Sequence, residues 1–227
     1  MITFAVLIVL VLGTWGPIKR FRVVGLSPSE LASKSLLPSV PDDRCGNMQR
    51  PIARVPPKTV FRIDDPLTAD EVAIYKAVLA AWVDKSTKLN VADRTFALDR
   101  DVDCECLKGM DVDSVTQATR SFHKLGRESL IGKASLVDTE EQSRIVRLND
   151  PERTMQSGAR VDVAVKRAFA NGLFRLSEIA FDKEHRRALV GYSLVCGSLC
   201  GNGGTWLFEK KNGEWKRSEI NCGGWIS

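Results

Sequence analysis

The sequence has few of the residues and motifs by which active sites are recognised. Only two histidines occur among the 227 residues, His123 and His185, and both are expected to be solvated surface groups. No G-x-S-x-G elbow is present, because the residue two positions after Ser198 is a cysteine. The segment 201–204 does not form G-x-G-x-x-G, since Trp206 stands where the third glycine is needed. The sequence therefore predicts neither a serine hydrolase nor a phosphate-binding loop, and no cofactor.

Long blocks of one charge are also absent. The 33 basic residues are interspersed with 28 acidic ones, and the formal net charge is +5. Proteins that bind nucleic acid usually carry a basic patch, often with interleaved aromatic residues, and no such pattern occurs here. Nucleic acid is therefore not a predicted partner. The share of apolar residues, 44%, is that of a globular protein and excludes a chain that is disordered throughout.

Residues 1–18 are expected to form a signal peptide or an N-terminal anchor. The apolar run from Ile2 to Leu12 has the length of a signal-peptide core and is short for a bilayer span. No basic residue precedes the run, whereas Lys19 and Arg20 follow it, and this distribution by itself favours a cytoplasmic C-terminal side. Export is the leading interpretation, and an uncleaved anchor that would tether the chain to a membrane is the alternative. Six cysteines suit an oxidising compartment. We therefore expect an exported protein, which would be periplasmic, extracellular or membrane-anchored.

Proline is almost missing from the last two-thirds of the chain. Eight of the nine prolines lie at or before Pro66. The segment 19–58 mixes them with polar residues without helical or strand periodicity, so we expect it to be an extended linker. Cys45 is the position in this linker that a disulfide could fix. Residues 59–227 are expected to form a single domain.

Two longer helices are predicted in this domain. Thr68 and Glu71 have the spacing of a capping box, and apolar residues then recur at helical spacing, so a helix is expected from Ala69 to about Asp84. A second helix is expected between Met155 and Ala170. Its predicted inner face consists of Val161, Val165, Ala168 and Phe169, and its predicted left-handed stop is the pair Asn171 and Gly172. Between these helices we expect a strand at Asn90–Leu98, a short helix at Val112–His123 and a strand at Ala134–Val137.

Strand patterns fill the C-terminal part of the chain. The four predicted strands are Leu173–Phe181, Ala188–Val195, Thr205–Lys211 and Glu214–Ile220. The fold class is therefore predicted to be α+β, with helices packed on a four-stranded C-terminal antiparallel β-meander. A type I′ turn at Asn212-Gly213 would place Lys211 opposite Glu214, Lys210 opposite Trp215, Phe208 opposite Arg217 and Trp206 opposite Glu219. Trp206, Phe208 and Trp215 would then share the buried face.

Six cysteines allow fifteen complete pairings, and local geometry narrows them. Cys196 and Cys200 flank a three-residue bend and could bridge each other. Cys104 and Cys106 are too close to pair comfortably, and Cys45 and Cys222 are available to them. The alternative is a tetrahedral thiolate site for zinc built from residues 104, 106, 196 and 200, although neither pair has the C-x-x-C spacing of a zinc knuckle.

An acidic run, Asp99, Asp101 and Asp103, invites the hypothesis of a calcium site. An EF-hand loop would need glycine where Cys104 stands and a bidentate glutamate where Met110 stands. The run is therefore expected to be a solvated strand edge, and no metal site is predicted.

The segment Cys196–Gly204, CGSLCGNGG, is predicted to be a tight cross-linked loop. The favoured interpretation is that its glycines only allow positive backbone angles at the bend, since glycines are far commoner in turns than in binding nests. The second hypothesis is a recognition surface that consists of Asn202, Gly203 and Gly204 beside Trp225. Successive glycine amides can form a nest for an anion or a carboxylate.

The pattern LSEIAFDKEHRRALVGYSLVCGSLCGNGGTWLFEKKNGEWK, followed by WIS, resembles a group of uncharacterised bacterial secreted or envelope proteins. In these proteins a CGxLCG loop follows an aliphatic strand and precedes a Lys-x-Gly-x-Trp hairpin. The similarity covers about Leu173 to Ser227. The matching positions are Phe181, Cys196, Gly197, Cys200, Gly201, Gly213 and Trp215. The resemblance implies an α+β domain and no particular activity.

These patterns favour a non-enzymatic interaction or binding domain of the cell envelope or extracellular space, stapled by disulfides, with an unknown partner. The alternative is a hydrolase-type enzyme whose site is assembled from scattered residues such as Glu178, Asp182 and His185. A histidine and two carboxylates brought into one partly dry cleft would favour the enzyme.

Overall fold

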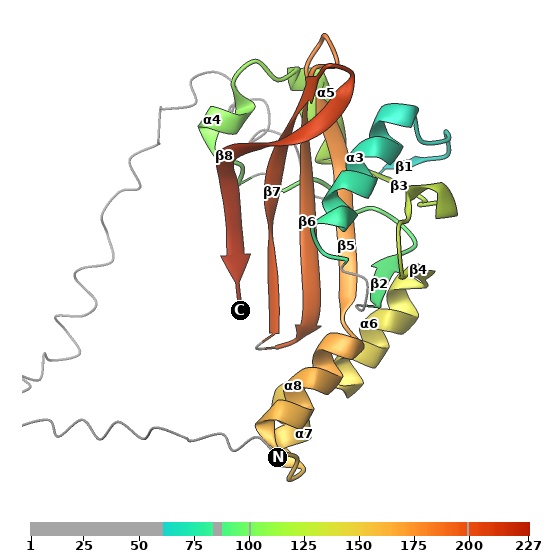
Figure 1. Ribbon diagram of the computed structural model, residues 1–227, viewed down its shortest axis with the longest axis vertical. Coiled ribbons are helices and arrows are strands. Elements are labelled where there is room, and N and C mark those ends of the chain that lie inside the picture. Colours follow the sequence, from blue (N-terminus) through green and yellow to red (C-terminus); the bar gives the residue numbers. More distant parts are fainter. Residues whose placement is uncertain (1–60, 84–87, 100, 199) are drawn as a thin grey trace, which may run out of the picture. The chain divides into compact units, whose positions relative to one another are not determined.

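The computed structural model describes residues 61–83, 88–99, 101–198 and 200–227 (Figure 1). The predicted leader at 1–18, the predicted linker at 19–58 and Cys45 lie outside the described residues. Among the helices that are described, none combines the length and the apolar character needed to cross a membrane.

A six-stranded sheet forms the centre of the described structure, with the strand order β4-β2-β5-β6-β7-β8. The strands are β2 (Leu89–Ala92), β4 (Ala134–Val137), β5 (Leu173–Phe181), β6 (Arg187–Gly197), β7 (Cys200–Lys211) and β8 (Glu214–Ile226). β4, β2 and β5 run parallel, whereas the last four strands are antiparallel neighbours in chain order. The fold is thus mixed α/β, and the expected four-stranded sheet is too small because two short parallel strands extend it beyond β5.

Helices lie on both faces and at one end of this sheet (Figure 1). They are α3 (Ala69–Ala80), α4 (Cys104–Leu107), α5 (Val112–Ala118), the 3-10 helix η2 (Arg127–Ser129), α6 (Thr139–Leu148), α7 (Pro151–Gln156) and α8 (Val161–Ala170). A second, two-stranded parallel sheet pairs β1 (Phe61–Ile63) with β3 (Ser121–His123). The predicted helix at Val112–His123 therefore ends early, and its last three residues are a strand.

Two hydrophobic clusters lie on opposite faces of the sheet because successive strand residues point to opposite sides. In β6, Val190 packs in the cluster that contains Tyr75 of α3, and Leu189 packs in the cluster that contains Leu107 of α4. β6 is therefore an interior strand that is covered on both faces. Helices cover part of both faces of the sheet. The candidate site described below lies on the last three strands.

The first predicted helix is confirmed with its capping box. Thr68 accepts a hydrogen bond from the amide of Glu71, and the Glu71 carboxylate accepts one from the amide of Thr68, at 3.3 and 2.7 Å. The helix ends at Ala80, before the predicted end at Asp84, which lies outside the described residues.

The second predicted helix is two helices, α7 and α8, because Gly158 adopts a φ of 94° between them. The predicted inner face of α8 is mostly wrong: Val161 and Phe169 are 63% and 54% exposed, and Ala168 is buried. Small alanines allow α8 to lie against the Cys196–Cys200 bridge, and the larger apolar residues point outward. The predicted left-handed stop is also wrong, since Asn171 has a φ of −105°.

The hairpin of β7 and β8 confirms three of the four predicted cross-strand pairs. Trp206 is the exception: it lies opposite Asn221 and not Glu219, because irregularities between Phe208 and Gly204 add residues to β8. Bulges of this kind leave no clear signal in the sequence. The burial of Trp206, Phe208 and Trp215 is confirmed, with exposures of 9%, 1% and 9%.

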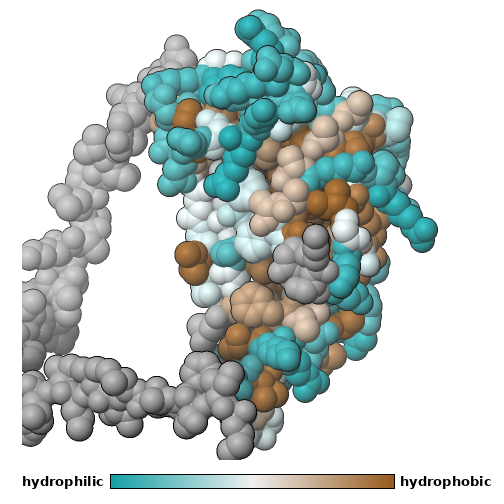
Figure 2. All heavy atoms as spheres, in the orientation of Figure 1, coloured by the Kyte–Doolittle hydropathy of each residue, from teal (hydrophilic) through white to brown (hydrophobic). Residues whose placement is uncertain are grey.

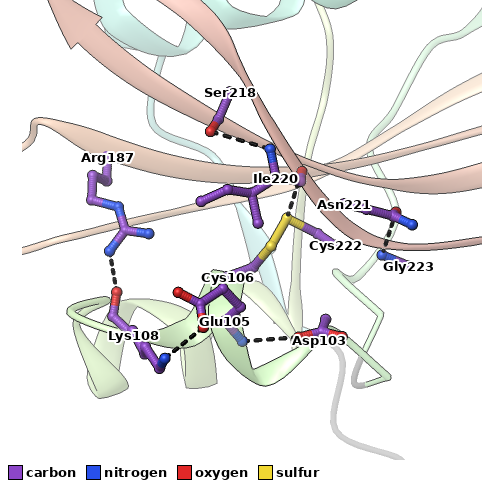
Figure 3. Close-up of a disulfide and its surroundings, with 10 residues drawn as sticks. All are labelled: Asp103, Glu105, Cys106, Lys108, Arg187, Ser218, Ile220, Asn221, Cys222 and Gly223. Carbon is purple, nitrogen blue, oxygen red and sulfur yellow. Dashed lines mark hydrogen bonds and ion pairs between the residues drawn. A yellow bond between two sulfur atoms is a disulfide. The ribbon is translucent and has the colours of Figure 1, made fainter.

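Two disulfides are described in full. Cys196–Cys200 spans the turn from β6 to β7, and Cys106–Cys222 joins α4 to β8 (Figure 3). Cys104 is also disulfide-bonded, and no described cysteine is a free thiol. The alternative of a zinc thiolate site is therefore wrong, because its four sulfur atoms are oxidised.

Candidate functional site

The glycine segment after the Cys196–Cys200 bridge is a strand and not a loop. Residues 201–204 belong to β7 and pair with β6 on one side and with β8 on the other. β6 ends at Gly197 and β7 begins at Cys200, and the positive φ of 143° belongs to Gly197. None of the glycines at 201, 203 and 204 has a positive φ, so turn geometry does not explain them.

These glycines make room for the indole ring of Trp225. A Cβ atom on Gly203 would lie 2.6 Å from Nε1 of Trp225 and 2.8 Å from the carbonyl oxygen of Tyr192. A Cβ atom on Gly201 would lie 3.2 Å from Cζ3 of Trp225. The indole therefore lies directly on the backbone of β7 while 44% of the residue stays exposed. A large, fixed aromatic surface at the end of a sheet is a common anchor for ligands.

Trp225 borders a groove of about 590 Å³, which we call the Trp225 groove. Its lining comes from the last three strands and consists of Tyr192, Asn202, Gly203, Thr205, Trp206, Arg217, Glu219, Ile220, Asn221, Gly223, Gly224, Trp225 and Ile226. Figure 2 shows a pale area of intermediate hydropathy over β7 and β8, between a hydrophilic upper end and a more apolar lower end. Three of the four predicted binding residues, Asn202, Gly203 and Trp225, thus line one concavity.

The Trp225 groove contains polar groups that are poised for a ligand. The Arg217 guanidinium lies 3.8 Å from the ring centroid of Trp206, which in turn lies 4.5 Å from the ring of Tyr192. The side-chain oxygen of Asn202 is buried and has no hydrogen-bond partner. An unpaired buried acceptor costs about 1–3 kcal/mol.

A second depression of about 390 Å³ adjoins the groove and shares Trp225 with it; we call it the Asp99 pocket. It is lined by Phe96, Asp99, Asp101, Gly191, Tyr192, Ser193, Gly204, Thr205, Gly223, Gly224 and Trp225. The pocket brings the acidic run of the sequence next to the predicted recognition surface, and it includes Gly204, the fourth predicted binding residue. The sequence alone gives no signal that these two segments lie together, because about one hundred residues separate them.

A buried ion pair lies elsewhere, between β3 and β5. Nδ1 of His123 is 2.7 Å from Oε2 of Glu178, and the two residues are 7% and 3% exposed. The amide of His123 donates to Oε1 of the same carboxylate at 2.7 Å, and the Thr95 hydroxyl also donates to it. The hydrogen bond to Glu178 raises the pKa of His123 above its ordinary value, against the opposing effect of burial. The prediction that His123 is a solvated surface group is therefore wrong.

His185 and Asp182 do not join this pair in the way the hydrolase hypothesis requires. Asp182 accepts hydrogen bonds from the amides of Arg186 and Arg187, at 2.6 and 2.9 Å, and so stabilises the turn before β6. His185 is exposed, as predicted, and stacks on Phe181 with ring centroids 4.7 Å apart.

A cavity of about 180 Å³ nevertheless brings two histidines and two carboxylates together. Its lining includes His123, Glu178, Glu71 and His185. The neighbouring hydroxyl of Ser114 already accepts a hydrogen bond from the amide of Phe181 at 2.8 Å. Within the described residues, the cavity thus holds an oriented imidazole but no hydroxyl that is hydrogen-bonded to it.

Comparison with protein-family models, with curated proteins and with solved structures gives no match for this chain.

Proposed function

We propose that this protein is a non-enzymatic binding domain of the cell envelope or extracellular space and that it binds a saccharide chain in the Trp225 groove. The observation that carries the proposal is the exposed indole of Trp225, which lies against the backbone of β7 and borders an open groove with polar lining residues.

The disulfides support the proposed location. Two bridges are closed, and Cys104 is oxidised as well. Structural disulfides form and persist mainly in oxidising compartments such as the periplasm and the extracellular space. An exported binding domain accounts for this oxidation state.

The chemistry of the groove suits a saccharide. The faces of Tyr and Trp rings are apolar and can cover the C–H face of a sugar ring, while their edges stay wet. Sugar hydroxyl groups both donate and accept, and the groove offers amides at Asn202 and Asn221, a carboxylate at Glu219 and a guanidinium at Arg217. The groove is open and polar, whereas sites for small apolar ligands are enclosed and mostly apolar. A chain lying along the surface therefore fits better than a small apolar molecule.

Two other macromolecular ligands fit less well. A nucleic acid would meet the carboxylates of Glu219, Asp99 and Asp101, which oppose a polyphosphate backbone. A peptide added as a further strand would need the outer edge of β8, where the carbonyl of Cys222 already accepts a hydrogen bond from the amide of Asp103 at 3.3 Å.

The test is retention of the full chain on a panel of immobilised neutral, acidic and amino polysaccharides. We expect at least one polysaccharide to retain the protein, and Trp225→Ala to weaken that binding by about 30-fold, which corresponds to about 2 kcal/mol for a central aromatic anchor. Phe169→Ala, which removes an exposed aromatic ring from α8, is the matched control and should bind like the wild type. Absence of binding to the whole panel, or equal binding by Trp225→Ala, would contradict the proposal.

A hydrolase is the second candidate function, and the observation that favours it is the oriented His123–Glu178 pair in a cavity with Glu71. In a hydrolase the imidazole would accept a proton from water or from a substrate hydroxyl. Hydrolysis of ester or glycoside substrates by the wild type, lost in His123→Gln and kept in His185→Gln, would favour this candidate. Equal rates in all three proteins would exclude it.

A further inference from the structure

We infer that the Asp99 pocket binds the protonated amino group of an amino sugar, so that the saccharide chain in the Trp225 groove is one that carries free amines. This inference rests on the proposed function and specifies its ligand. It is carried by four features of the pocket, which are its carboxylates, its two unpartnered hydroxyls, its aromatic walls and its continuity with the groove.

The charged residues that line the pocket are both acidic. Asp99 and Asp101 are exposed, and in the described structure neither forms an ion pair. The carboxylate of Asp99 accepts one hydrogen bond, from the amide of Asp101 at 3.1 Å, and this leaves further lone pairs available. Two adjacent carboxylates without a cationic partner repel each other, and a cation placed between them relieves that repulsion.

Two hydroxyls on the floor of the pocket provide an independent indication of a ligand. Ser193 and Thr205 are 8% and 5% exposed, and both line the pocket. Within the described residues, neither hydroxyl forms a hydrogen bond, and neither oxygen is a fully buried atom, so both are accessible from the pocket. An ammonium group carries three donors and no acceptor, so carboxylates and hydroxyls are the partners it requires.

The walls of the pocket are the aromatic rings of Phe96 and Trp225. Aromatic faces attract ammonium groups through the ring quadrupole, by about 0.5–1 kcal/mol at exposed sites. Arg175 already lies 4.9 Å from the ring centroid of Phe96, which shows that this ring accepts a cation; Arg175 itself is not a lining residue. Trp225 is therefore the wall available to the ligand.

The pocket and the groove share Trp225 and the backbone of Gly223 and Gly224. Because no side chains project from these glycines, a sugar on the Trp225 side of the groove can place its substituent in the pocket. A calcium ion fits less well, since Ca²⁺ takes 6–8 oxygen ligands and the pocket supplies two carboxylates. An amino sugar would place its ring in the Trp225 groove and its amine in the Asp99 pocket.

The test compares three oligosaccharides of equal length by isothermal titration of the full chain, at a pH where the amine is protonated. The probes are a glucosamine oligomer, its N-acetylated form and a glucose oligomer. We expect the amino form to bind at least 10-fold more tightly than the other two. The double variant Asp99→Asn, Asp101→Asn should remove this preference while keeping the shape of the pocket. Asp162→Asn on α8, a carboxylate remote from the pocket lining, is the matched control and should keep the preference.

The outcomes separate the inference from the proposed function. Equal binding of all three oligomers, lost in Trp225→Ala, would overturn the amine preference and leave the saccharide function standing. A preference that survives the double aspartate variant would overturn the assignment to this pocket. Binding of a lysine oligopeptide as tightly as the glucosamine oligomer would overturn the saccharide class, and binding of none of the probes would contradict both proposals.

Discussion

His123 and Glu178 form a buried, hydrogen-bonded pair of titratable residues. Their side chains are 9% and 4% exposed, and a hydrogen bond of 2.7 Å joins them. Removing one member of a buried pair typically costs about 3 kcal/mol, because the other member stays buried without its partner. The sequence did not reveal this pair, since a three-residue strand is too short for alternation to show which side chains point inward.

The raised pKa of His123 predicts a pH dependence of the free energy of unfolding. The folded state binds this proton more tightly than the unfolded state, whose pKa is about 6.5. The stabilisation should therefore be complete below about pH 6.5 and be lost as the pH rises through the raised pKa. Urea unfolding at a series of pH values should show this loss in the wild type.

His123→Gln should abolish the loss of stability above about pH 6.5, whereas His185→Gln, which alters an exposed ring, should keep it. The pKa can also be read directly from the ring proton signals of His123 in the wild-type protein. A value at or below about 6.5, the ordinary pKa of histidine, would contradict the assigned role of Glu178.

At the scale of elements, β7 decides the shape of the site. Its glycines let Trp225 approach the strand, and the irregularities opposite Trp206 bring Asn221 into the groove.

The bounds of β5 and the first pairs of the hairpin were predictable, because strand alternation and the Asn212-Gly213 turn are local signals. The pairing of β2 and β4 with β5 was not predictable, because it depends on contacts between distant segments. Asn202 and Trp225 were predicted together, but Arg217 and Tyr192 join them only through the sheet register.

Gly203→Ala should destabilise the protein by about 1–3 kcal/mol, because the new methyl group would meet the backbone oxygen of Tyr192 and the indole of Trp225. Gly172→Ala is the control, since the nearest atom to its Cβ would be Cδ1 of Leu194, a movable side-chain atom, at 3.2 Å. Thermal unfolding should show a larger loss for Gly203→Ala, accompanied by a change in tryptophan fluorescence. Equal losses in the two variants would contradict the packing of Trp225 on β7.

The two described disulfides should contribute unequally to stability. Cys106–Cys222 joins residues 116 positions apart, whereas Cys196–Cys200 joins residues 4 apart. Loop-closure entropy predicts losses of about 5 and about 2 kcal/mol when each pair is replaced by alanine. Denaturant unfolding of the two double variants measures the difference. A larger loss for the Cys196–Cys200 pair would show that its contribution comes from the native contacts with α8 and not from loop closure.

At the scale of the whole molecule, a disulfide holds the strand that carries the candidate site. Cys106–Cys222 joins β8 to α4 three positions before Trp225, so the bridge restrains the strand that borders the groove. Mass spectrometry of the protein recovered from the compartment where it resides, without reduction, should show the two cross-linked peptides. Free thiols at these four positions would contradict the proposed location.

The central claim is that a saccharide occupies the Trp225 groove, and a chemical-shift map tests it most directly. On titration with the oligosaccharide that the protein binds, the account predicts the largest shifts at the Trp225 indole N–H and at the side-chain amides of Asn202 and Asn221, with α8 unchanged. Shifts concentrated on α8 or around His123, with the Trp225 indole unmoved, would contradict it.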